Sequence, residues 1–122
     1  MKMQNEGRKI LHLPELRATC TCVRVPVLRS HSISVTVVTE QKVTVEEARR
    51  VISAFPGDIL TDDLGENLYP MPLRSSDKDE VLVGRIREDL TDENGLSLFC
   101  CGDQLRKGAA SNAVQIAQLL IR

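Results

Sequence analysis

The sequence contains very few aromatic residues. They account for 2% of its 122 residues, and tryptophan is absent. Proteins that bind single-stranded nucleic acid stack bases on aromatic side chains, so the sequence predicts no nucleic-acid partner. The formal net charge of -1 also argues against a general attraction to nucleic acid or to an anionic membrane. Because 42% of the residues are hydrophobic and so few are aromatic, we expect a core of aliphatic side chains.

Long apolar runs are lacking as well. No stretch reaches the roughly 18 residues that a transmembrane helix needs. Residues 1–10 contain no apolar segment typical of a secretory signal. The sequence therefore predicts a protein without a membrane partner that is located in the cytoplasm, and it leaves an organelle such as a plastid open. At this length we expect a single domain over residues 1–122.

Nucleotide-binding and metal-binding patterns are also missing. Neither G-x-G-x-x-G nor G-x-x-x-x-G-K-[S/T] occurs in the sequence. The four cysteines, Cys20, Cys22, Cys100 and Cys101, have no spacing typical of zinc sites, so we expect structural thiols and no metal. Cys100 and Cys101 are adjacent in a predicted strand, so one of them is expected in the core.

Hydrophobic periodicity predicts the order of the elements. Alternating or β-branched stretches predict strands over residues 20–27, 33–38, 58–60, 81–87 and 96–101. Thr44 and Glu47 have the spacing of a capping box, which predicts a helix that Pro56-Gly57 ends. Residues 1–11 and 105–120 are predicted as helical, and residues 61–78 as a loop. This order predicts an α+β fold, with a mixed, mostly antiparallel sheet and helices on one face.

Residues 22–32 contain two side chains of chemical interest. Arg24 lies among apolar neighbours in a predicted strand, where a buried arginine needs an anionic partner such as a carboxylate. His31 follows between two serines, where an imidazole can act as general acid or base near neutral pH. The alternatives are an arginine that reaches solvent and a hydrogen-bonded surface histidine.

Two further segments allow a functional or a structural interpretation. Glu6 and Lys9 lie one helical turn apart, and they form either a surface ion pair or a charged pair that faces a polar substrate. Residues 102–110 connect a predicted strand to a predicted helix, where free amides can bind an anion. Alternatively, Gly102 and Gly108 only permit close approach of the backbone.

Taken in order, these segments resemble the C-terminal half of the aspartate-β-semialdehyde dehydrogenase family. The matching segments are residues 6–11, 22–32, 69–73, 83–87 and 102–116. The resemblance implies the catalytic and dimerisation domain of the glyceraldehyde-3-phosphate-dehydrogenase-like superfamily. It also implies an oxidoreductase activity: reductive dephosphorylation of aspartyl-β-phosphate to aspartate semialdehyde with NADPH, in the biosynthesis of lysine, threonine and methionine.

The resemblance implies a role for each of five residues. Glu6 corresponds to a glutamate that binds the substrate, Lys9 to the lysine that engages its phosphate, and Arg24 to the arginine that clamps its carboxylate. His31 corresponds to the catalytic acid/base. Gln104 corresponds to a position near the nicotinamide and the nucleophilic cysteine.

The sequence departs from the family pattern in three respects. None of its cysteines matches the position of the nucleophile, the NADP-binding domain has no counterpart, and Gly7 stands where the family commonly has threonine. We therefore expect a chain that is inactive alone and forms a homodimer or joins a complementing N-terminal half. The alternatives are a non-catalytic dimerisation module, a gene remnant, and a relative that reduces N-acetylglutamyl phosphate.

Overall fold

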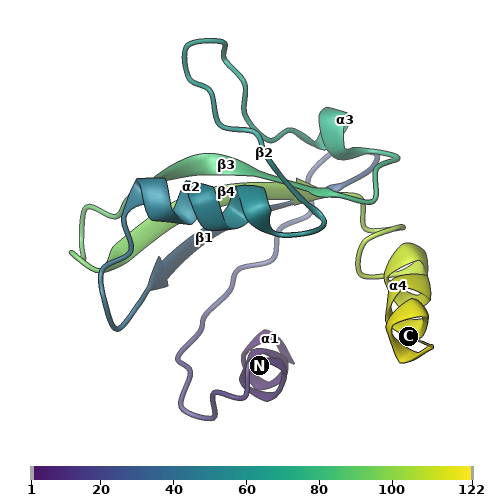
Figure 1. Cartoon of the computed structure of the whole chain (residues 1–122), viewed down its shortest axis with the longest axis horizontal. Coiled ribbons are helices and arrows are strands. Elements are labelled where there is room, and N and C mark those ends of the chain that lie inside the picture. Colours follow the sequence, from purple (N-terminus) through teal and green to yellow (C-terminus); the bar gives the residue numbers. More distant parts are fainter. Residues whose placement is uncertain (1, 122) are drawn as a thin grey trace.

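The structure is a computed structural model that describes residues 2–121, and its centre is a four-stranded sheet (Figure 1). The strand order is β1-β4-β3-β2, in which β2 and β3 are parallel and the other neighbours are antiparallel. The predicted α+β class and mixed sheet are therefore confirmed. The elements are α1 (Lys2–Ile10), β1 (His31–Val38), α2 (Val45–Ala54), β2 (Asp58–Leu60), α3 (Pro72–Ser75), β3 (Val81–Glu88), β4 (Gly95–Gly102) and α4 (Ala110–Leu120).

Helix α2 packs on one face of the sheet, as the sequence predicts. Its capping box is present: the Thr44 hydroxyl accepts the Glu47 N–H at 3.2 Å, and the Glu47 carboxylate accepts the Thr44 N–H at 3.0 Å. On its inner face Ala48 is buried with Ile86 of β3 and Leu96 of β4. This small aliphatic cluster joins α2 to the middle of the sheet.

The buried carboxylate of Asp62 binds the backbone of β3 at an irregular position of the strand. The Asp62 side chain, only 1% exposed, pairs with Arg49 of α2 at 2.9 Å. It also accepts the N–H groups of Arg85 at 2.8 Å and Ile86 at 3.3 Å. These contacts hold a bulge at which Arg85 has a φ of 56°, and the register between β3 and β4 shifts there.

The strand predicted over residues 20–27 is wrong. In the structure this segment is exposed and pairs with no strand among residues 2–121. Its alternating pattern favours an extended chain, but a strand also needs a neighbour that accepts its hydrogen bonds. Two smaller differences concern the ends of other elements: α4 begins at Ala110 and not at 105, and the predicted loop over 61–78 contains α3.

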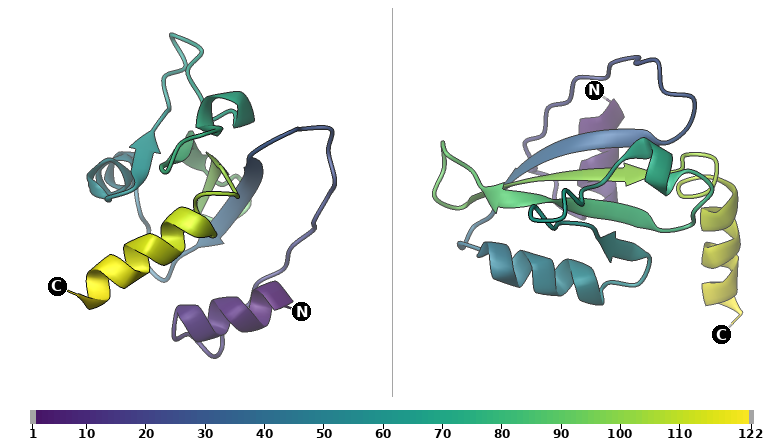
Figure 2. Two further views of the ribbon diagram at one scale, coloured as in Figure 1. Left: turned by 90° about the vertical axis from the view of Figure 1, so that its right-hand side faces the viewer. Right: turned by 90° about the horizontal axis from the view of Figure 1, so that it is seen from above.

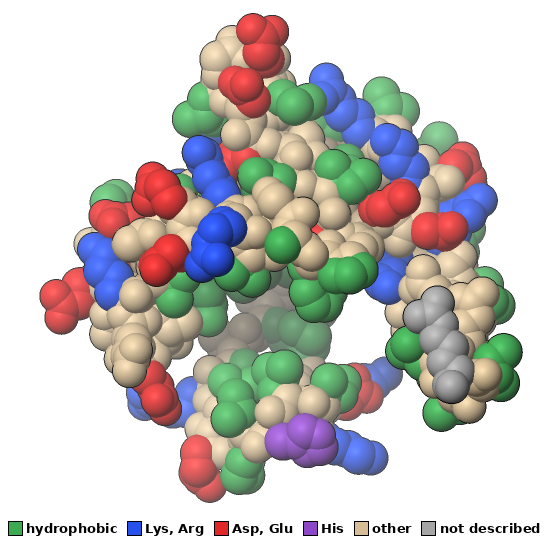
Figure 3. All heavy atoms as spheres, viewed as in Figure 1, with side chains coloured by type: hydrophobic (Ala, Val, Ile, Leu, Met, Phe, Trp, Pro, Cys, Tyr) green, Lys and Arg blue, Asp and Glu red, His purple; other side chains and the backbone are tan. Residues whose placement is uncertain are grey.

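Helices α1 and α4 stand apart from the sheet. Neither buries a residue, and α1 is joined to β1 by the connecting segment, residues 11–30, which runs on the side of the molecule opposite α2 (Figure 2). An open gap separates α1 from the sheet, with apolar side chains on both of its sides (Figure 3). Among residues 2–121 no helix is long and apolar enough to cross a membrane.

Candidate functional site

His31 is the first residue of β1, and its position is set by the pairing with β4. Its Cα lies opposite that of Gly102, the last residue of β4. The imidazole is exposed, so it is accessible to a ligand. The preceding residue, Ser30, is buried and has a φ of 78°, a conformation that residues other than glycine rarely adopt.

Gln104 lies directly beside this junction. It follows β4 by two residues, is half-buried, and accepts the Ser30 N–H through its Oε1 atom at 2.8 Å. The contact joins residues 74 positions apart in the sequence. The structure thus joins Gln104 to the residue that precedes His31, so two of the five residues that the resemblance singles out lie at one junction.

A charged cluster that the sequence did not predict lies behind this junction. Arg29 places its Nε 2.8 Å from Asp103 and its Nη1 2.7 Å from Asp77. The Asp103 side chain is fully buried and also accepts the backbone N–H groups of Asp77 at 2.7 Å and Leu105 at 2.9 Å. Arg29 precedes β1 and Asp103 follows β4. These opposite charges at the ends of two strands could have suggested the pair from the sequence.

The carboxylate of Asp103 remains ionised although it is buried. Burial by itself raises the pKa of such a carboxyl, because a low-dielectric interior disfavours the charged form. The N–H groups of Asp77 and Leu105 and the charge of Arg29 outweigh burial, so the pKa of Asp103 is lowered. The contact with Arg29 is an ion pair in which the Nε–H is not aligned as a hydrogen bond.

Arg24 lies in the connecting segment and is exposed. Its apolar neighbours had suggested a buried arginine that needs an anionic partner. Because Arg24 is exposed, it needs no such partner. Among residues 2–121 no hydrogen bond or ion pair is recorded between Arg24 and His31 or Gln104. Its guanidinium is free to meet a carboxylate that comes from solution.

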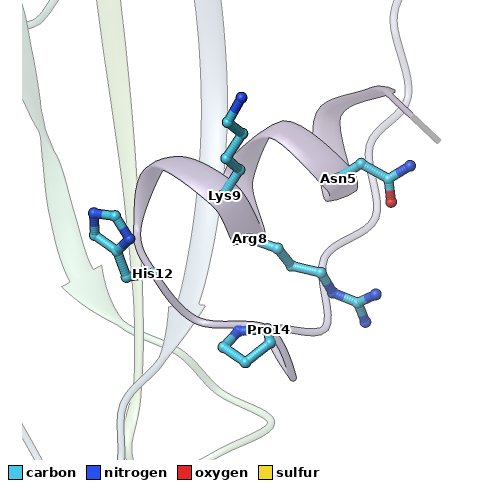
Figure 4. A pocket seen from close by; sticks show the side chains of 5 residues that line it. All are labelled: Asn5, Arg8, Lys9, His12 and Pro14. Carbon is cyan, nitrogen blue, oxygen red and sulfur yellow. The ribbon is translucent and has the colours of Figure 1, made fainter.

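Glu6 and Lys9 lie on α1, away from His31. Glu6 pairs with Lys2 at 3.8 Å and not with Lys9, and both side chains of this pair are largely exposed. Lys9 lines a hollow beside α1, whose other lining residues are Asn5, Arg8, His12 and Pro14 (Figure 4). Arg8 and Lys9 point in different directions in this view, and the Arg8 Nε donates to the carbonyl of Leu16 at 2.8 Å. The Arg8 side chain is thus held against the backbone, whereas no hydrogen bond within residues 2–121 fixes the Lys9 side chain.

The cysteines do not form an activated site. All four are free thiols, and Cys101 is buried while Cys20 and Cys22 are exposed. Burial, with smaller effects of neighbouring charges, raises the pKa of Cys100; burial also raises that of Cys101 although the Ser32 hydroxyl opposes it. A raised pKa disfavours the reactive thiolate. Within the described chain no group of three or more histidine, cysteine or acidic residues could hold a metal.

Gln104 has one polar group left for a ligand. Because Gln104 Oε1 already accepts the Ser30 N–H, its Nε2 group remains a donor for a carboxamide oxygen. The start of α4 offers less, because the N–H groups of Ala110 and Asn112 already donate to the carbonyls of Leu105 and Arg106, at 3.4 Å and 3.3 Å. The residues present fit one nicotinamide contact and not a pyrophosphate-binding turn.

The chain matches a known class of domain. Residues 1–107 match the family described as semialdehyde dehydrogenase, dimerisation domain, and the chain belongs to this family. More specifically, the aspartate-semialdehyde dehydrogenases of Prochlorococcus marinus and Synechocystis are 53% and 52% identical to it over 99% of the chain. The match covers 35% and 36% of these proteins, so the chain spans about a third of the length of the curated relatives.

Solved structures agree with this assignment. Aspartate semialdehyde dehydrogenase II from Vibrio cholerae, complexed with ASA, matches the whole chain with a TM-score of 0.93 at 40% identity, over 36% of its own length. The aspartate semialdehyde dehydrogenase from Francisella tularensis matches 99% of the chain with a TM-score of 0.82 at 33% identity, over 34% of its own length. The resemblance inferred from the sequence is therefore confirmed.

Proposed function

We propose that this chain supplies the substrate-binding groups, the acid/base and the dimer contacts of an aspartate-semialdehyde dehydrogenase. The observation that supports this most strongly is the junction of β1 and β4, where Gln104 accepts the N–H of Ser30, the residue before exposed His31. The substrate would be aspartyl-β-phosphate or, in the reverse direction, aspartate semialdehyde and phosphate. Residues 1–122 would act as one domain.

Each charged side chain has a counterpart on this substrate. Arg24 would bind the α-carboxylate through its planar fork, Glu6 the ammonium group, and Lys9 the phosphate. His31 would manage the proton of a cysteine nucleophile or of the leaving phosphate. Arg24 lies on the connecting segment, which forms no strand within residues 2–121, and Glu6 and Lys9 lie on α1.

The remaining catalytic groups would come from outside residues 1–122. Burial raises the pKa of Cys100 and Cys101, and no cysteine of this chain matches the family's nucleophile position, so a cysteine outside residues 1–122 would act as nucleophile. NADP supplies or accepts the hydride when bound, and Gln104 is the residue of this chain proposed to contact it. Most of the dinucleotide would be held by the domain that contains the glycine-rich turn.

Exposed apolar side chains support the need for a partner. Val23, Val25 and Ile33 are 72%, 62% and 51% exposed, and Phe55, which directly follows α2, is 60% exposed. Exposed apolar patches of this kind typically mark protein interfaces. We propose a homodimer that is completed by the nucleotide-binding part, in the same polypeptide or in a separate one. The name of the family supports dimerisation, which is also the second candidate function should the chain prove non-catalytic.

A complementation assay tests the proposed function. The 122-residue chain is mixed with the N-terminal two-thirds of the Synechocystis relative, and NADPH formation is followed with semialdehyde, phosphate and NADP. We expect turnover only in the mixture, and a loss of about 100-fold or more with His31→Gln. Arg24→Lys should raise KM, because lysine cannot form the bidentate contact.

Arg50→Lys serves as the matched control, because Arg50 is an exposed residue of α2. It should leave turnover unchanged. Full turnover with His31→Gln would refute the proposed acid/base. A folded dimer that binds the N-terminal part without turnover would favour the dimerisation module.

A further inference from the structure

The backbone immediately before His31 is held in an unusual conformation by three segments. Ser30 is only 7% exposed and has a φ of 78°. Its N–H donates to Gln104, and its hydroxyl lies 3.2 Å from the Ser76 hydroxyl. A strained residue of this kind persists only where its surroundings fix it. The entrance to β1 is therefore tied both to the segment after β4 and to the segment after α3.

The Arg29 cluster joins the same segments a second time. Arg29 precedes Ser30, and Asp103 precedes Gln104, so the ion pair at 2.8 Å and the hydrogen bond at 2.8 Å lie in parallel between residues 29–30 and residues 103–104. Asp77 closes the cluster, because its carboxylate contacts Arg29 and its N–H donates to Asp103. One guanidinium thus bridges two carboxylates from different segments.

We propose that Arg29 and Asp103 are positioning residues that fix His31 and Gln104 relative to each other for the reaction. This inference rests on the proposed function and adds to it the origin of the site's geometry. Arg29 is already matched by Asp77 and Asp103, so it is not available to a substrate carboxylate. Arg24 is exposed and remains the proposed ligand of the substrate carboxylate. The two arginines, five residues apart in the sequence, thus have different functions.

Exchange of the Ser30 amide tests the positioning role in the chain itself. Arg29→Lys keeps the charge but cannot bridge both carboxylates, so we expect the Ser30 amide to exchange about tenfold faster with solvent. The amides that pair β3 with β4 should keep their rates, because the cluster does not contribute to that ladder. Both rates are measured by NMR in one experiment.

Two further variants make this result specific. Arg106→Lys alters a neighbouring arginine that pairs with Asp79 at 3.1 Å and does not contact Ser30, so it should leave the Ser30 rate unchanged. Asp77→Asn removes only the outer contact of Arg29, from a side chain that is 69% exposed, and should give a smaller increase. If Arg29→Lys does not fold, the Ser30 exchange rate in Asp77→Asn tests the proposal. Unchanged Ser30 exchange in the folded variants would overturn the proposal.

Kinetics of the complemented enzyme separate positioning from binding. A displaced acid/base lowers kcat, so Arg29→Lys should reduce kcat by about tenfold to 100-fold with KM unchanged. A rise in KM like that expected for Arg24→Lys would make Arg29 a substrate ligand and would overturn the proposal. Absence of turnover with the unaltered chain would refute the proposed function instead, while the exchange rates would still decide whether Arg29 fixes Ser30.

Discussion

At the scale of single residues, the most informative side chain is the fully buried carboxylate of Asp103. An ionised group is buried only where other groups replace its hydration. Two backbone N–H groups and Arg29 do so here, and all three come from different parts of the chain. Asp103 is thus a point at which the segments around His31 meet.

The lowered pKa of Asp103 predicts a specific dependence of stability on pH. A carboxyl whose pKa is lower in the folded state stabilises the fold above its ordinary pKa, and this contribution is lost as the pH falls through the folded value. Asp103→Asn should therefore be less stable than the unaltered chain at neutral pH. The difference should shrink on acidification below the ordinary aspartate range, as measured by urea unfolding at a series of pH values.

Asp58 provides a comparison of opposite sign. Burial raises its pKa, although Lys107 opposes the shift, so the folded state favours the protonated form. Relative to Asp58→Asn, the unaltered chain should become more stable as the pH falls. A difference between Asp103→Asn and the unaltered chain that does not change with pH would contradict the account of Asp103.

At the scale of elements, β3 depends on a close approach of the backbone at Gly84. A Cβ atom at this position would lie 2.0 Å from the Thr61 carbonyl oxygen and 2.8 Å from the Pro70 ring. The crossing of residues 61 and 70 over the strand thus requires glycine. Gly84→Ala should destabilise the fold by about 1–3 kcal/mol or more, because the backbone must shift to admit the methyl group.

Gly7 in α1 is the matched control for this prediction. Its added Cβ would meet only the Leu16 side chain, at an ordinary 3.6 Å. Gly7→Ala should be neutral or stabilise the chain by up to about 1 kcal/mol, since alanine favours a helix. Both changes are measured by urea unfolding, and equal effects of the two variants would show that the approach at Gly84 is not limiting.

Elements that depend on local sequence could be predicted, and those that depend on a distant neighbour could not. The capping box at Thr44 and Glu47 spans only four consecutive residues, and α2 begins there. The alternation of Ile33, Val35 and Val37 is similarly local, and β1 contains it. Residues 20–27 have an equivalent pattern but no strand beside them in the described structure, so pattern alone predicted a strand that is not formed.

The candidate site shows the same division. His31 could be proposed from its neighbouring residues, and Gln104 from the family resemblance. Their link through Ser30, and the pairing of Arg29 with Asp103, join positions more than 70 residues apart and follow only from the antiparallel register of β1 and β4. The left-handed conformation of Ser30 has no signal in the sequence, because it arises from those contacts.

At the scale of the whole molecule, the sheet is ordered by its own contacts while α1 and α4 stand apart. Neither helix buries a residue, and apolar side chains flank the gap beside α1 (Figure 3). The surface beside α1 is thus not covered by other parts of the described chain. Uncovered apolar side chains are expected if a further protein surface packs against them, and the central claim is that the rest of a dehydrogenase provides this surface.

The most direct test of this claim is a fused chimera, in which this chain replaces the matching third of the Synechocystis enzyme. The fusion removes the requirement that two separate chains find each other. We predict a folded protein with NADP-dependent turnover of aspartate semialdehyde that is lost with His31→Gln and retained with Arg50→Lys. A folded chimera without turnover, or one whose turnover survives His31→Gln, would contradict the account.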